Sequence, residues 1–223
     1  MENIQKNRNI LLNEIKNCHQ KSTFKKFDVT RLVAVSKKQE DYKIELAIAS
    51  GQKIFGENRV QEAQTRWEER QKIYKDLDLR LIGPLQTNKV KQALGLFDKI
   101  ETIDREKLAK EISTHFQNTV KTESFYIQIN TGSESQKSGM QPLEADDFIL
   151  YCKNDLKLPI IGLMCIPPQN EEPAMHFSLL KKIAERNSLK ELSMGMSNDY
   201  LEAIKFGATS VRIGSLFFGK REY

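Results

Sequence analysis

Residues 31–40 read RLVAVSKKQE, an apolar and β-branched run that meets two lysines. Side chains alternate between the faces of a strand, so Val33, Val35 and Lys37 share one face, and Lys38 begins the connection to the next element. A lysine at this position is either a strand-end side chain that reaches into solvent or an amine held in a pocket for chemistry. The rest of the chain has to distinguish these two interpretations.

Seven further short apolar runs follow, and longer amphipathic stretches separate them. The runs begin at residues 53, 79, 97, 124, 158, 189 and 209, and the clearest amphipathic stretches are 57–74, 104–117, 142–154 and 171–187. Alternation of this kind predicts a parallel sheet, because parallel strands are joined by crossover helices. Eight such units predict an α/β fold, a single (β/α)8 TIM barrel.

The first 20 residues precede this alternation and have helical periodicity. They predict an extra N-terminal helix whose loose apolar stripe consists of Ile4, Ile10, Leu11, Leu12 and Ile15. No linker rich in Pro, Gly or Ser divides the chain, so residues 1–223 are expected to form one domain.

Composition narrows the class of protein. The chain has 223 residues, of which 39% are hydrophobic and 29% charged, as in ordinary globular proteins. The net charge of +5 is spread without a dense basic block, so nucleic-acid binding is not expected. The N-terminal segment lacks the long apolar core of a signal peptide or membrane span. The scattered Cys18, Cys152 and Cys165 predict neither a disulfide framework nor a metal site, and a reduced, cytoplasmic protein is the expectation.

The last two predicted strand ends carry features of an anion site. In SMGMSNDYLEAIKFG, Ser197 is expected to be a helix N-cap, with Asp199 in the first turn and Gly207 as the stop. A helix N-terminus attracts anions, and barrels commonly bind phosphate after strands 7 and 8. In TSVRIGSLFFGK, a Gly-Ser pair ends the strand and alternation turns Arg212 inward, where a guanidinium needs an anion.

The eighth strand of a closed barrel neighbours the first, so this anion site would lie beside Lys37. An amine next to a phosphate site suits a ligand that carries both an aldehyde and a phosphate, such as pyridoxal 5′-phosphate (PLP). A Schiff-base aldolase acting on a phosphorylated sugar would use the same two features, and this alternative stays open.

Seven motifs also resemble one known family. They are AVSK, FGENRVQEA, LIGPLQTNK, QKSGM, GLMCIPP, LSMGMSNDYLEAI and VRIGSLFFGKREY, which extend from Ala34 to Tyr223. In this order they resemble the pyridoxal phosphate homeostasis proteins, single-domain barrels related to the alanine racemase N-terminal domain. The resemblance implies PLP as cofactor and assigns six residues to it. Lys37 would be the Schiff-base lysine and Asn58 would lie near the ring, while Ser197, Gly214 and Ser215 would hold the phosphate and Arg212 would lie at the phosphate or the ring.

Two positions depart from the common family pattern. Arg59 stands where the family often has tyrosine, and Cys165 stands where a small residue is usual. A polar segment, residues 131–140, is typical of a mobile loop. Its Lys137 is either solvated or, if the loop folds over the barrel mouth, a second amine near the cofactor.

The expected role is to hold and supply PLP. Racemisation requires acid and base groups on both faces of the ring, and in alanine racemase the second group is a tyrosine from another domain of a partner subunit. This sequence stops just after the eighth strand, so no catalytic residue is assigned and an enzyme is not expected. A weak PLP-dependent racemase or lyase is the alternative. PLP-dependent apoenzymes are possible recipients, and a monomer is expected.

Overall fold

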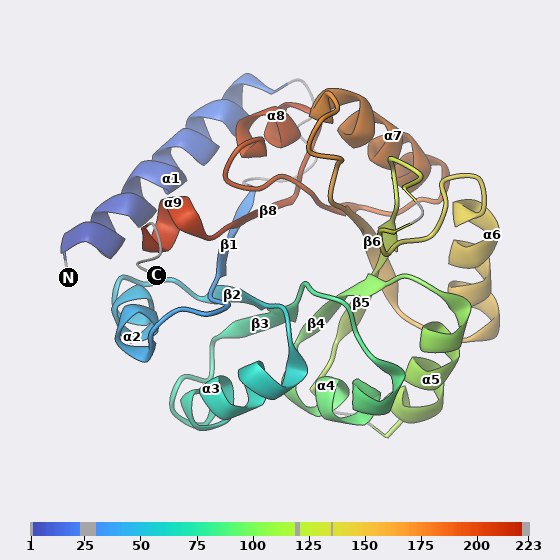
Figure 1. The fold of residues 1–223 in the computed structure, drawn as a ribbon, viewed down its shortest axis with the longest axis horizontal. Helices are drawn as coiled ribbons and strands as arrows, with labels where there is room; N and C mark the ends of the chain where they lie inside the picture. Colours follow the sequence, from blue (N-terminus) through green and yellow to red (C-terminus); the bar gives the residue numbers. More distant parts are fainter. Residues whose placement is uncertain (1, 23–29, 119–120, 135, 220–223) are drawn as a thin grey trace.

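The computed structural model describes residues 2–22, 30–118, 121–134 and 136–219. Eight parallel strands close into a barrel in chain order, with β8 beside β1 (Figure 1). The predicted barrel is confirmed, and each predicted apolar run overlaps one strand. The strands are β1 (Arg31–Val35), β2 (Ile54–Glu57), β3 (Asp78–Leu81), β4 (Lys99–Ile103), β5 (Ser124–Ile129), β6 (Ile160–Cys165), β7 (Glu191–Ser193) and β8 (Ser210–Ile213).

Helices form a ring outside the strands (Figure 1). The predicted amphipathic stretches overlap α3, α5, α6 with η2, and α7. The turn η1 is of the 3-10 type, and η2 is a π-helix. The helical segments are α1 (Glu2–Lys21), α2 (Asp41–Ala49), α3 (Val60–Ile73), η1 (Thr87–Lys89), α4 (Val90–Leu96), α5 (Glu106–Phe116), α6 (Ala145–Leu150), η2 (Tyr151–Asp155), α7 (Pro173–Arg186), α8 (Tyr200–Lys205) and α9 (Ser215–Phe218).

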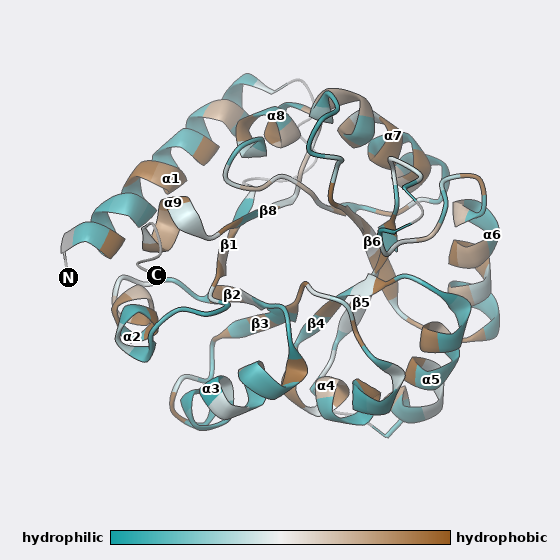
Figure 2. Ribbon diagram, in the orientation of Figure 1, coloured by the Kyte–Doolittle hydropathy of each residue, from teal (hydrophilic) through white to brown (hydrophobic). Residues whose placement is uncertain are grey.

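The apolar core lies between the outer faces of the strands and the helices. Figure 2 shows that the helices carry both hydrophobic and hydrophilic residues. Leu32 and Ala34 of β1 belong to this core. Val33 faces the barrel interior, where a Cβ added to Gly56 of β2 would lie 3.1 Å from it. The alternation predicted for β1 is therefore correct within the strand.

Helix α1 packs outside the barrel against α8 and α9 (Figure 1). Ile4, Leu11 and Ile15 are buried there, but the predicted stripe is wrong at Ile10, which is 46% exposed. The spacing of the three buried residues keeps one narrow face inward, and Ile10 falls outside that face. The side-chain amide of Asn7 also donates to the Phe217 carbonyl at 3.1 Å.

Neither a membrane-spanning helix nor a group of metal ligands occurs among the described residues. No helix in the described part of the chain is both long and apolar enough to cross a membrane. The same described residues contain no group of three or more His, Cys, Asp or Glu side chains suited to a metal ion. Cys18, Cys152 and Cys165 are free thiols.

Candidate functional site at the barrel mouth

The turn after β1 carries both lysines of the opening stretch. The strand ends at Val35, and the Gln39 amide donates to the Ser36 carbonyl at 3.1 Å, so Lys37 and Lys38 occupy the turn between them. Extending the strand alternation to Lys37 was therefore wrong, because the chain turns after Ser36. Lys37 is nevertheless half-buried, whereas Lys38 is exposed and has a left-handed φ of 57°.

A buried ion pair fixes this turn from outside the barrel. The carboxylate of Glu57, fully buried at the end of β2, accepts hydrogen bonds from Ser36 Oγ at 2.7 Å and from Trp67 Nε1 at 3.0 Å. Arg66 donates to the same Glu57 oxygen at 3.0 Å. Its guanidinium also donates to the carbonyls of Ser36 and Gln39, each at 3.0 Å. Helix α3 thereby holds both ends of the turn that carries the lysines.

Asn58 follows β2 and meets Lys37 in a cavity of about 230 Å³, which Lys38, Arg59 and Glu62 also line. The Asn58 side-chain oxygen is buried and has no hydrogen-bond partner among the described residues. Gly83, which follows β3, packs closely against the Asn58 backbone, because a Cβ on Gly83 would lie 2.3 Å from the Asn58 carbonyl oxygen. Only glycine allows this close approach.

A second cavity of about 700 Å³ adjoins the first and shares Asn58 and Arg59 with it. The segment after β3 forms much of its wall. Its other lining residues are Val60, Gln61, Pro84, Leu85, Gln86, Lys89, Asp104, Arg105 and Ser138. Its volume is in the range of small-molecule sites.

Ser197 lies in the segment after β7, but its predicted N-cap role is wrong. Helix α8 begins at Tyr200 and Asp199 is the residue before it. The Asp199 carboxylate accepts the Met196 amide at 2.6 Å, so a turn stabilised by aspartate precedes the helix. Gly207 follows the helix with φ of 91°, and its predicted role as the stop is confirmed.

The serine hydroxyls after the last two strands lie side by side. Ser215 Oγ donates to Ser197 Oγ at 3.1 Å. Gly214 precedes Ser215 and lies against the first strand, because a Cβ added to it would be 3.5 Å from Val35. The pair of hydroxyls is thus next to the end of β1, two residues before Lys37.

Arg212 of β8 points into the barrel and is 3% exposed. Its guanidinium donates to Ser193 Oγ at 2.9 Å and to the Cys165 carbonyl at 2.8 Å. No carboxylate forms an ion pair with it among the described residues, and the expectation that its guanidinium needs an anion stays a prediction. Ser193 links it to a carboxylate, because the Ser193 hydroxyl donates to Glu101 at 2.5 Å.

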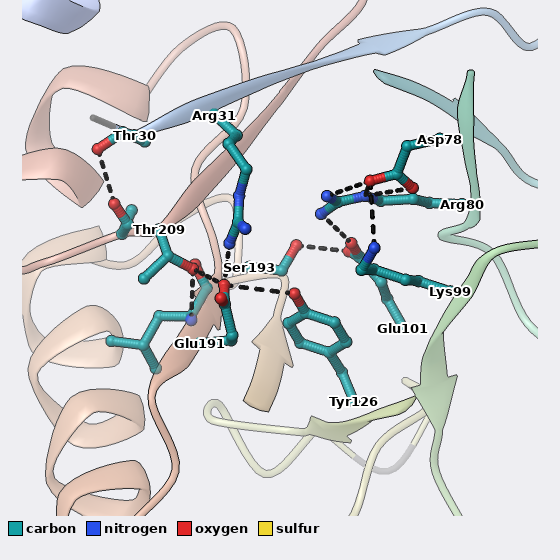
Figure 3. Close-up of polar contacts among 12 residues, drawn as sticks. Thr30, Arg31, Asp78, Arg80, Lys99, Glu101, Tyr126, Glu191, Ser193 and Thr209 are labelled. Carbon is teal, nitrogen blue, oxygen red and sulfur yellow. Dashed lines mark hydrogen bonds and ion pairs between the residues drawn. The ribbon is translucent and has the colours of Figure 1, made fainter. Parts of the chain in front are cut away.

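Glu101 continues into a buried charge network beneath the mouth (Figure 3). Its other oxygen lies 3.2 Å from Arg80, and Arg80 pairs with Asp78 at 2.7 Å. Burial opposes charge on Arg80, but Glu101 and Asp78 outweigh it and raise the Arg80 pKa. Burial would likewise raise the pKa of Asp78, yet Arg80 and Lys99 hold it below its ordinary value. Arg80 and Asp78 are therefore both charged near neutral pH.

A second interior cluster lies at the opposite, N-terminal end of the barrel. Glu191 pairs with Arg31 and accepts the Thr209 hydroxyl at 2.7 Å (Figure 3). Tyr126 donates to Glu191 at 3.5 Å. Burial, reinforced by the Glu101 charge, raises the Tyr126 pKa, so this phenol stays protonated. The Tyr126 hydroxyl is therefore bonded to Glu191 inside the barrel.

The polar segment that contains Lys137 is fixed to β5 and to the segment after β6. Gln128 donates to the Ser138 carbonyl at 3.0 Å, which brings Ser138 to the larger cavity. Lys137 pairs with Glu134 at 2.5 Å and donates to the Pro167 carbonyl at 3.5 Å. The lysine is therefore not merely solvated, and its role as a second amine stays a prediction.

The predicted site residues fall into three groups in the structure. Lys37 and Asn58 share a cavity, and Ser197, Gly214 and Ser215 gather at the adjoining strand ends. Arg212 hydrogen-bonds to none of these five within the described residues.

Sequence reasoning missed the Glu57–Arg66 pair and the Glu101–Ser193 link. A signal existed for Glu101, because it shares a strand face with Lys99 and interrupts an apolar run. Nothing local pointed to its partner, which is 92 residues away.

Comparison with known proteins identifies relatives of this barrel. The sequence pattern of the alanine racemase N-terminal domain matches residues 15–222. A pyridoxal phosphate homeostasis protein of Aquifex aeolicus is 40% identical over 185 residues, which cover 78% of this chain and 79% of the relative. The chain belongs to the pyridoxal phosphate homeostasis protein family. The family member of Haemophilus influenzae is 35% identical over 233 residues, covering 99% of this chain and 97% of its own.

Solved structures agree with this family membership. PipY of Synechococcus elongatus PCC7942 without PLP has a TM-score of 0.85 at 29% identity, covering 97% of this chain and 100% of PipY. The structure of PipY with PLP bound has a TM-score of 0.82. Alanine racemase of Acinetobacter baumannii shares the fold, with a TM-score of 0.73 at 16% identity over 62% of its chain. The resemblance seen in the seven motifs is confirmed, although residues 135 and 220–223 lie outside the described residues.

Proposed function

We propose that this chain binds PLP at the barrel mouth through Lys37 and holds it for intracellular supply. The observation that carries the proposal is the cavity in which Lys37 meets Asn58. The aldehyde of PLP condenses with a lysine amine to a Schiff base, and this is the chemistry that the cofactor supplies when bound. The residues of the chain bind and orient the cofactor.

The polar groups at the mouth fit this cofactor. The Asn58 side-chain oxygen is buried without a partner among the described residues, and a buried acceptor of this kind calls for a donor. We propose that Asn58 faces the cofactor ring. The turn held by Arg66 and Glu57 keeps Lys37 directed at the same space.

The strand ends after β7 and β8 suit the phosphate. The Ser197 and Ser215 hydroxyls are 3.1 Å apart, so both can donate to one phosphate group after a small rotation. Gly214 lies against Val35 at the end of β1, which keeps this pair near Lys37. Barrels commonly bind phosphate at this position, beside a short extra helix such as α9.

Arg212 is proposed to contact the cofactor at the ring or the phosphate. If it lies against the pyridine nitrogen, its positive charge disfavours protonation there and makes the ring a weaker electron sink. That arrangement suits holding over turnover. Arg212→Gln is expected to weaken PLP binding by about 1.5–3 kcal/mol, the scale of a hydrogen bond to a charged group.

A holding function fits the names of the relatives, which are homeostasis proteins. Three described tyrosines donate hydrogen bonds to carboxylates and are occupied in this way, the first being Tyr74, which donates to Glu45 at 3.3 Å. Tyr126 bonds to Glu191 and Tyr200 donates to Glu14 at 2.6 Å. We further propose a cytoplasmic monomer formed by one domain, residues 1–223, that delivers PLP to PLP-dependent apoenzymes.

Borohydride trapping tests the proposal. The wild-type protein incubated with PLP and then reduced is expected to carry the added mass on the peptide containing Lys37, and mass spectrometry reads the position. Lys37→Ala should lose the absorbance of the lysine-bound cofactor yet keep weaker binding through Ser197 and Ser215. Lys38→Ala is the matched control and should retain the covalent link. Added mass on Lys38 or Lys137 with Lys37 bare would overturn the assignment.

A further inference from the structure

The Arg212 guanidinium is held by two neutral acceptors, a serine hydroxyl and a backbone carbonyl. Of these two, only the serine hydroxyl can change its direction. A guanidinium has five N–H donors. Two of them go to Ser193 Oγ and to the Cys165 carbonyl, and the described residues offer no acceptor for the others. The carbonyl is fixed by strand β6, whereas the hydroxyl is a rotor that can either donate or accept. What sets the direction of that rotor decides how Arg212 is held.

Glu101 sets it. An ionised carboxylate can only accept, so the Ser193 proton must point at Glu101, and their 2.5 Å separation is typical of a hydroxyl bonded to a charged carboxylate. With its proton committed there, Ser193 presents oxygen lone pairs to Arg212. The negative charge of Glu101 thus acts on Arg212 through two consecutive hydrogen bonds, in a region where low polarity strengthens each of them.

Glu101 is itself held from its other side. Arg80 lies 3.2 Å from its second oxygen and is anchored in turn by Asp78 at 2.7 Å (Figure 3). The four side chains Arg80, Glu101, Ser193 and Arg212 are each at most 3% exposed. They connect β3, β4, β7 and β8 across the inside of the barrel, so rotation of any one leaves a buried polar group unpaired.

We propose that Ser193 and Glu101 are positioning residues for the cofactor: they orient the Arg212 guanidinium toward the mouth before PLP binds. The inference rests on the proposed function, in which Arg212 contacts PLP. It adds two residues that themselves lie below the mouth and act only through Arg212.

The test is a double-mutant cycle read by equilibrium titration with PLP. Ser193→Ala leaves Arg212 without its hydroxyl acceptor and should weaken PLP binding about tenfold, which corresponds to ~1.4 kcal/mol. In the Arg212→Gln background the same substitution should cause no further loss, because the group it positions is gone. Ser193→Thr keeps the hydroxyl and should restore binding.

Ser210→Ala is the matched control. Ser210 is also a fully buried serine of the barrel interior, and its hydroxyl has no partner among the described residues. Its removal should leave PLP affinity unchanged in both backgrounds.

Two results would overturn the inference. One is wild-type affinity in Ser193→Ala, and the other is an equal loss in both Arg212 backgrounds, as a purely structural defect would produce. If Ser193→Ala does not fold, Glu101→Gln carries the same cycle, because it keeps the shape and removes the charge. An Arg212-dependent loss then supports the inference and an equal loss overturns it. Trapping at Lys37 is independent of this cycle, so failure of the cycle with trapping intact removes only the positioning role.

Discussion

Replacing Arg66 by glutamine is expected to destabilise the fold and the cofactor site together. Arg66 makes three hydrogen bonds of 3.0 Å, to Glu57 and to the carbonyls of Ser36 and Gln39. Its removal leaves the fully buried Glu57 carboxylate with only two neutral donors, Ser36 and Trp67. Breaking a buried pair costs about 3–5 kcal/mol, and since those two donors remain we expect the lower end, about 3 kcal/mol.

Arg70 offers a matched control one turn further along α3. Its side chain is 14% exposed against 15% for Arg66, so the two arginines are equally buried. The ion-pair partners of Arg70 are Glu45, 46% exposed, and Asp41, 71% exposed. Exposed partners remain solvated when the arginine is lost, so Arg70→Gln should cost below about 1 kcal/mol.

Urea unfolding measures both variants. Trp67 is the only tryptophan of the chain and is fully buried against Phe55, so its fluorescence reports unfolding. Titration with PLP should in addition show weaker binding for Arg66→Gln, because the turn that carries Lys37 loses two of its bonds. Equal stability losses in Arg66→Gln and Arg70→Gln would refute the reasoning, since it depends on the burial of Glu57.

Two further predictions concern titration and thiol reactivity. Although burial acts in the opposite direction, Arg80 holds the pKa of Asp78 below its ordinary value of 3.8. The stability that results is fully present above pH 3.8 and is lost as pH falls through the lower, folded-state pKa, and each pH unit between the unfolded and folded pKa values contributes about 1.4 kcal/mol. Below pH 3.8 the free energy of unfolding should therefore fall more steeply in wild type than in Asp78→Asn, and parallel curves would contradict the pairing. Burial raises the pKa of the Cys152 and Cys165 thiols to about 12, so iodoacetamide should modify the half-exposed Cys18 first and the other two only in urea. Equal rates at the three thiols without urea would show that the two cysteines are accessible.

The barrel was predictable because eight short runs rich in apolar residues alternate with longer stretches of helical pattern. The sites were predictable only where chemistry follows a strand directly. Lys37 and Asn58 come immediately after β1 and β2, and the structure brings them to one cavity. Ser197 was given the wrong local role, because Asp199 competes for the same turn and its carboxylate is the stronger acceptor.

The rest depends on distances that the sequence does not express. Ser193 and Glu101 meet only because β4 and β7 face one another across the closed barrel. Strand alternation gives the face of each side chain, but it does not give the partner on the opposite wall. The Glu57–Arg66 pair was hidden for a related reason, since Arg66 reads as one more charge on a solvated helix.

The packing of α1 has a consequence for how the protein is made. Asn7 bonds to a carbonyl 210 positions later in the chain, and β1 pairs with β8. On the ribosome, α1 and β1 emerge long before either partner exists. The apolar face of α1 and one edge of β1 therefore stay exposed to solvent through most of translation. Unpaired strand edges of this kind promote aggregation. Ser215, in the helix against which α1 packs, follows the last strand, so the nascent chain pairs its two mouth hydroxyls only after all eight strands have emerged.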